Sequence, residues 1–149
     1  IYQSDLCGWV GQLGYNKDSI YGANVFTAEG NETLKAASFY ATGKDSQYEL
    51  YVVRQFEDET SLEKMIPVAS GKLNQGIEVD AGERYAVVLY IITPGSVHPM
   101  AIEYAADEAT ENVDLDDGES YISANGSKWV SVDTVEKSNL CIKAFSDNR

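Results

Sequence analysis

The segment Arg84-Tyr85-Ala86-Val87-Val88-Leu89-Tyr90-Ile91-Ile92-Thr93 is apolar at nearly every position. Successive side chains of a strand point to opposite faces, so in an extended conformation both faces of this segment are apolar and both need cover. Pro94-Gly95 ends the segment, because Pro lacks the N–H that a sheet requires and Gly frees the backbone. The segment therefore predicts the central strand of a β-sheet.

Shorter segments on either side alternate between apolar and polar residues, the period-2 pattern of strands with one buried face. In residues 76–80, Ile77 and Val79 point inward while Glu78 and Asp80 point outward. Helical periodicity is nearly absent, and the only helix that we expect is a connection of one or two turns around residues 60–65. We expect strands at residues 19–27, 33–42, 48–54, 76–80, 84–93, 100–104, 120–123, 129–132 and 139–145.

Turn signals separate these segments. Gly30-Asn31 suits a turn, and Asn125-Gly126 is a strong signal for a hairpin. About nine to eleven short strands without intervening helices predict an all-β fold, a jelly-roll-like sandwich of two antiparallel sheets. The length of 149 residues is that of one ordinary domain, so we expect residues 1–149 to form a single domain.

The composition is that of a globular protein with a strongly acidic surface. Hydrophobic residues make up 44% and charged residues 23% of the chain, which fits neither disorder nor a membrane span. Eleven basic residues against 24 acidic ones give a net charge of −13, which repels nucleic acid and anionic membranes. The excess of carboxylates suits an extracellular surface, a neutral or cationic ligand, or a bound Ca²⁺. Because the chain starts at Ile1 without a signal segment, we expect it to be excised from a longer protein.

Catalytic arrangements are poorly supported. Cys7 and His98 form the only available nucleophilic pair, but Cys7 lies in a strand-like, acidic setting that would raise the pKa of its thiol. Zinc is disfavoured because His and Cys do not cluster. We therefore expect no enzymatic activity from this chain.

Calcium has one candidate loop, at residues 28–32, where Glu29, Asn31 and Glu32 offer carboxylate and amide oxygens. The alternative is a plain solvated turn, since Asn and Glu are common in loops. Residues 114–118 resemble the start of an EF-hand loop, but their glycine falls one place early and no helix flanks them. They belong to the acidic stretch 107–119, which we expect to be a solvated loop.

Aromatic residues favour carbohydrate binding. The chain has 10 Tyr and 2 Trp, and sugar rings present apolar C–H faces that stack on exposed aromatic rings. The candidates at loops or rims are Tyr15, Tyr21, His98 and Tyr121. For each of them packing within the sandwich is the alternative, because Tyr and Trp are favoured strand residues. We assign to packing outright Trp9, Trp129, Tyr48 and Tyr85.

The two cysteines, Cys7 and Cys141, lie near opposite ends of the chain. A disulfide between them would stabilise the fold by about 4 to 5 kcal/mol in the loop-entropy model. Two half-buried thiols are the alternative, because buried Cys behaves as a small hydrophobe.

Several segments together resemble the lectin-like domain that follows the catalytic domain in papain-type cysteine peptidases of Gram-positive bacterial surfaces. They occur in the same order and span almost the whole chain: residues 8–10, 21–28, 32–40, 48–53, 81–88, 118–123 and 139–145. The resemblance implies a jelly-roll sandwich like a carbohydrate-binding module, secreted with a peptidase domain beside it in the same chain. It also favours free thiols, since such bacteria seldom rely on disulfides. It transfers no sugar-binding residue, because the matching positions are mainly strand and turn residues.

We therefore expect a non-catalytic accessory module of a cysteine peptidase, located outside the cell or on the surface of a Gram-positive bacterium. Its expected partner is a carbohydrate or a cell-wall polymer. The alternative is a spacer or docking domain that packs on the peptidase domain and has no glycan ligand, which predicts an exposed apolar patch.

Overall fold

The computed structural model describes residues 11–63, 76–103, 119–132 and 139–148. Within these ranges the chain forms eleven strands and one short helix. In chain order they are β1 (Gly11–Leu13), β2 (Ser19–Thr27), β3 (Glu32–Phe39), β4 (Gln47–Arg54), α1 (Glu59–Glu63), β5 (Ile77–Val79), β6 (Arg84–Ile92), β7 (Met100–Glu103), β8 (Glu119–Ser123), β9 (Val130–Ser131), β10 (Asn139–Leu140) and β11 (Ile142–Asn148).

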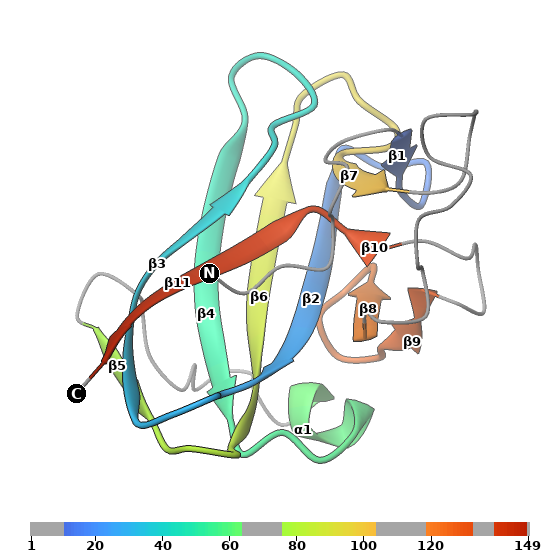
Figure 1. Ribbon diagram of the computed structural model, residues 1–149. Coiled ribbons are helices and arrows are strands. Elements are labelled where there is room, and N and C mark those ends of the chain that lie inside the picture. Colours follow the sequence, from blue (N-terminus) through green and yellow to red (C-terminus); the bar gives the residue numbers. More distant parts are fainter. Residues whose placement is uncertain (1–10, 64–75, 104–118, 133–138, 149) are drawn as a thin grey trace, which may run out of the picture.

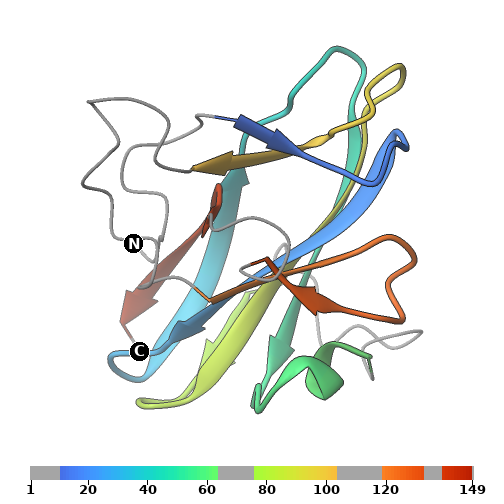
Figure 2. The ribbon, with the colours of Figure 1, turned by 90° about the vertical axis from the view of Figure 1, so that its right-hand side faces the viewer.

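The strands form antiparallel sheets that pack face to face. The largest sheet has the order β4-β6-β2-β8-β9, and two three-stranded sheets have the orders β11-β3-β5 and β1-β7-β10. In Figure 1, β3 and β11 cross in front of β4, and the view turned by 90° in Figure 2 separates these two layers. The predicted all-β sandwich is confirmed.

Strand β6 is central, as its sequence predicts, because β4 and β2 pair with its two edges along almost its whole length. Its alternate side chains enter two different apolar clusters. Tyr85, Val87, Leu89 and Ile91 lie in the inner cluster between the layers. The residues between them include Ala86 and Val88, which lie in a second cluster on the outer face of the five-stranded sheet. Both faces of β6 are therefore covered, which explains why both are apolar.

The helix has a larger role than the expected connection. It starts at Glu59 and ends at Glu63, and it buries the side chain of Leu62 completely. Leu62, Phe56 and Trp129 pack over Ala86 and Val88 in the outer cluster. The helix therefore covers part of the outer face of the five-stranded sheet; Figure 2 shows it below the strands.

The predicted strand at residues 139–145 is two strands. β10 pairs with β7, whereas β11 pairs with β3, so the chain passes from one sheet to another at Cys141. Asn24 of β2, which is 1% exposed, holds this corner: its Nδ2 donates to Leu140 O at 2.8 Å and to Ile142 O at 3.0 Å. Its Oδ1 accepts a hydrogen bond from Ser120 Oγ.

Cys141 is buried, and its backbone N donates to Ala101 O at 3.1 Å. Cys7 lies outside the described residues, so the disulfide and its alternative, two free thiols, both stay predictions. The strand predicted at 33–42 ends at Phe39, although Ala41 forms an isolated bridge with Met100.

The assignment of Tyr48 to packing is wrong. Tyr48 is 58% exposed, although its ring meets that of Phe39 with centroids 4.9 Å apart. Trp129 and Tyr85 are buried as predicted, and Trp9 lies outside the described residues. Tyr48 has the inward parity of Leu50 and Val52, but it lies near the start of β4, opposite the residue at which β3 ends.

A close approach at Gly14 joins the end of β1 to the loop after β6. A Cβ added at Gly14 would lie 2.5 Å from Val97 O and 2.7 Å from His98 Cα. Only a residue without a side chain fits between these backbones. The loop after β6 therefore packs directly against the backbone of Gly14, the residue before Tyr15.

Candidate functional site

The outer face of the five-stranded sheet carries an aromatic row. The register aligns Glu49 of β4 with Tyr90 of β6, and Tyr90 with Tyr21 of β2. The rings of Tyr21 and Tyr90 have centroids 4.3 Å apart, and the ring of Tyr21 meets Trp129 edge-on at 6.0 Å. Trp129 is held in place because its Nε1 donates to Gly126 O at 3.1 Å. Tyr90, Tyr21 and Trp129 therefore form a continuous, supported row, and both tyrosines remain half-buried.

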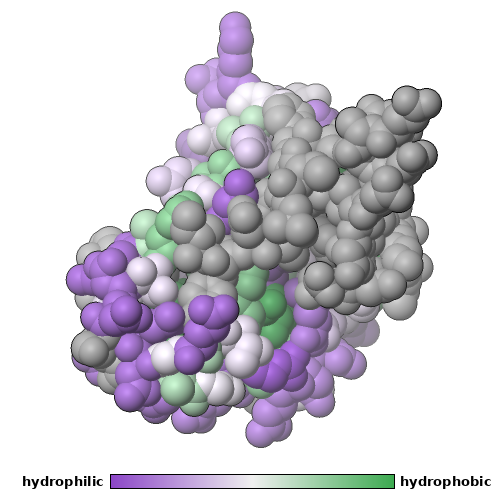
Figure 3. All heavy atoms as spheres, viewed as in Figure 1, coloured by the Kyte–Doolittle hydropathy of each residue, from purple (hydrophilic) through white to green (hydrophobic). Residues whose placement is uncertain are grey.

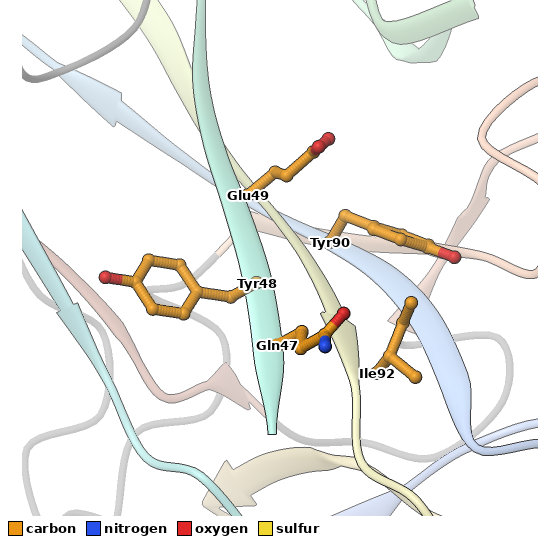
Figure 4. A pocket seen from close by; sticks show the side chains of 5 residues that line it. All are labelled: Gln47, Tyr48, Glu49, Tyr90 and Ile92. Atoms are coloured by element: carbon orange, nitrogen blue, oxygen red, sulfur yellow. The ribbon is translucent and has the colours of Figure 1, made fainter. Parts of the chain in front are cut away.

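A shallow groove of about 110 Å³ lies at the β4 end of this row. Its lining residues are Gln47, Tyr48, Glu49, Tyr90 and Ile92. Figure 4 shows that Tyr48 points to the opposite side of β4 from the other four. The groove is much smaller than the pockets of several hundred Å³ that enclose small ligands, so it suits a ligand that lies on the surface.

Glu49 supplies a carboxylate at the groove. Tyr51 donates its hydroxyl hydrogen to Glu49 Oε2. This hydrogen bond, together with burial, raises the pKa of Tyr51 to about 12, because the bond favours the protonated phenol. The bond also restrains the carboxylate and leaves Oε1 available. Within the described ranges, this is the one side-chain hydrogen bond of Glu49, and the exposed amide of Gln47 forms none.

Tyr121 lies on the same outer face as Tyr21, one row further along β8. Its hydroxyl donates to Glu119 Oε1 at 2.7 Å, and its ring packs on Phe56 with centroids 5.7 Å apart. Arg84 pairs with Glu119 and lies over the Phe56 ring at 5.0 Å from its centroid. Burial, and then the hydrogen bond to Glu119, raise the pKa of Tyr121. Tyr121 is thus fixed within a packed, charged cluster beside the aromatic row.

Tyr15 and His98 lie elsewhere. Tyr15 packs against the inner cluster, and burial raises the pKa of its phenol. His98 is exposed, with its backbone N donating to Ser96 Oγ at 3.1 Å. Neither residue lines the groove. The proposed nucleophile partner of His98, Cys7, falls outside the described residues.

Of the four predicted aromatic candidates, the outer face thus brings together two, Tyr21 and Tyr121.

The family model named "Lectin like domain" matches residues 1–146. The chain belongs to the lectin-like domain family. Searches of curated proteins and of solved structures returned no match.

The predicted calcium loop of this lectin-like domain is fastened by hydrogen bonds. Asn31 Oδ1 accepts from Ala81 N at 3.0 Å, which ties the turn after β2 to the turn before β6. Glu29 is exposed, whereas Glu32 is 7% exposed and begins β3. The described ranges contain no group of three or more acidic, His or Cys side chains arranged to hold a metal ion. A calcium ion bound by Glu29, Asn31 and Glu32 stays a prediction.

Sequence reasoning missed the residues that form the groove in the lectin-like domain. Gln47 and Glu49 alternate along β4 with the inward-facing Leu50 and Val52, so their parity already placed them on the other face. Tyr90 has the opposite parity from Leu89 and Ile91 in the same way. What the sequence lacks is the register that sets Glu49 beside Tyr90 and Tyr90 beside Tyr21.

The face of the molecule in Figure 3 is mainly hydrophilic, with small apolar areas. In Figure 3, hydrophilic residues dominate the lower end of the molecule and the projection at its top, with hydrophobic residues in small areas between them. The described residues include no helix long and apolar enough to cross a membrane.

Proposed function

We propose that this lectin-like domain is a non-catalytic carbohydrate-binding module, and that the groove beside the Tyr90–Tyr21–Trp129 row is its binding site. The observation that supports the proposal is that the half-buried ring of Tyr90 lies at one groove with the exposed amide of Gln47 and the exposed carboxylate of Glu49. Tyrosine rings stack on the apolar faces of sugars, while Gln47 and Glu49 are suited to hydrogen-bond their hydroxyl groups.

The wider setting of this proposal is a secreted or cell-surface cysteine peptidase of a Gram-positive bacterium, in which the module holds the enzyme near glycan or cell-wall material. The resemblance of the chain to the domain that follows such peptidase domains supports this setting. Because the groove is shallow, we expect millimolar to micromolar affinity, about 4 to 8 kcal/mol of binding free energy.

A binding assay with a matched pair of variants tests the proposal. The wild-type chain is screened on a glycan array, and hits are measured by calorimetry alongside Tyr90→Ala and Tyr40→Ala. Tyr40 is 40% exposed and does not line the groove, so Tyr40→Ala controls for loss of any exposed aromatic ring. We expect Tyr90→Ala to weaken binding at least tenfold and Tyr40→Ala to leave it unchanged. An array without hits, or equal effects of the two substitutions, would contradict the proposal.

A second function, docking on the peptidase domain, is favoured by a different surface. Tyr40 and Tyr48 are 40% and 58% exposed, and the ring of Phe39, the residue before Tyr40, contacts that of Tyr48. Large exposed aromatic side chains are candidates for a surface that a partner covers. Limited proteolysis and surface labelling of Tyr40 and Tyr48 in the full-length protein and in the isolated chain would test this function. Docking predicts protection in the full-length protein alone.

A further inference from the structure

We propose that the preferred ligand of the groove is a glycan with free amino groups, such as a chain of deacetylated hexosamines, and that Glu49 binds its ammonium group. This inference rests on the proposed function and specifies its ligand class.

Glu49 carries a charge that the described residues do not neutralise. The two ion pairs of the described ranges join Arg54 to Glu83 and Arg84 to Glu119, and neither involves Glu49. No basic residue lines the groove. Since the whole chain has a net charge of −13, the surrounding field also favours a cation over an anion at this position.

The carboxylate is held ready for a ligand. The hydroxyl of Tyr51 occupies Oε2, which restrains the Glu49 side chain without adding a positive charge. Figure 4 shows Glu49 pointing to the same side of the sheet as Tyr90 and Ile92, which supply apolar lining of the groove. A sugar that stacks on Tyr90 would thus have its substituents within reach of an oriented acceptor.

A free amino group fits this acceptor better than the alternatives. An ammonium group donates charge-assisted hydrogen bonds to a carboxylate, which are stronger than those of a neutral hydroxyl or amide. N-acetylation removes the charge, and a carboxylated sugar would meet repulsion from Glu49. Because Glu49 is exposed, water weakens the attraction, and we expect a preference of about threefold to tenfold rather than an absolute requirement.

The experiment compares three oligomers of equal length, made of glucosamine, N-acetylglucosamine and lysine, by calorimetry at neutral pH. The proteins are the wild type, Glu49→Gln, Asp147→Asn and Tyr90→Ala. Gln keeps the size of Glu49 and can still accept from Tyr51, whereas Asp147 is an exposed carboxylate of β11 in the opposite layer. Asp147→Asn therefore makes the same change in net charge away from the groove.

We expect the wild type and Asp147→Asn to bind glucosamine oligomers about threefold to tenfold more tightly than N-acetylglucosamine oligomers, and Glu49→Gln to lose this difference. Equal affinities in the wild type, or equal effects of the two charge substitutions, would overturn the inference. So would lysine oligomers that bind as tightly as glucosamine oligomers. If Tyr90→Ala abolishes glycan binding but the amino group has no effect, only this inference fails; if no glycan binds, the proposed function fails with it.

Discussion

Replacing Asn24 by Leu tests the interpretation that one buried amide holds the corner between β10 and β11. Leu has a similarly branched side chain but no polar atoms, so the change removes the hydrogen bonds of Asn24 without creating a cavity. Asn24 Nδ2 contacts the carbonyl oxygens of Leu140 and Ile142, residues that lie 116 and 118 positions along the chain. Its Oδ1 accepts from Ser120, whose hydroxyl oxygen in turn accepts from Leu140 N at 3.4 Å.

The expected loss of stability follows from these contacts. The substitution leaves two carbonyl groups and one hydroxyl without the partner that Asn24 provides. At about 1 to 2 kcal/mol for each buried group, the loss is about 3 to 6 kcal/mol. The added apolar contact of Leu returns about 1 kcal/mol. We therefore expect the free energy of unfolding to fall by about 2 to 5 kcal/mol, a large share of the total for a domain of this size.

Urea denaturation followed by circular dichroism and tryptophan fluorescence measures this change. Asn148→Leu, at an exposed position of β11, is the matched control and should change stability by less than about 0.5 kcal/mol. Ser120→Ala provides a second test, and its effect in the wild-type background does not depend on the folding of Asn24→Leu. It should cost about 1 to 2 kcal/mol in the wild type and less when Asn24 is already Leu. If Asn24→Leu lowered the free energy of unfolding by less than about 1 kcal/mol, its effect would approach that of a surface substitution, and the reasoning would be refuted.

Three further predictions concern a turn, a close approach and a phenol. Arg54 lowers the pKa of Glu83 below 4.5, so the stability that this carboxylate contributes is present above pH 4.5 and is lost on acidification. Urea denaturation at a series of pH values above and below 4.5 should show a smaller loss of stability on acidification for Glu83→Gln than for the wild type. Gly14→Ala forces backbones apart and should destabilise by about 1 to 3 kcal/mol, whereas Gly30→Ala, in open space, should not. Because the pKa of Tyr51 is about 12 instead of 10, stability should fall between pH 10 and 12. Glu49→Gln should lower the pKa of Tyr51 in an ultraviolet titration; an unchanged value would contradict the assigned hydrogen bond.

Much of the candidate site could not be predicted, because alternation along a strand gives only the face of the strand on which a side chain lies, not which strand lies beside it. Parity along β4 correctly separated Glu49 from Leu50. It failed for Tyr48, because the burial of an inward-facing residue also depends on how far the opposite layer extends, and β3 ends at Phe39. The sequence indicates Tyr21 as an aromatic residue at a loop or rim, but its place beside Tyr90 depends on the register of β2 on β6.

The sequence by itself determined the all-β class, the central position of β6 and most strand positions, because a period-2 pattern and turn residues act over a few neighbouring residues. The tertiary structure decided the break at Cys141, since the hydrogen bonds that hold it come from Asn24, more than a hundred residues away. It also decided the groove, where Glu49 and Tyr90 meet because β4 pairs with β6 and not with its neighbours in sequence. Pairing of distant strands depends on how the whole core packs, and no local pattern of residues contains that information.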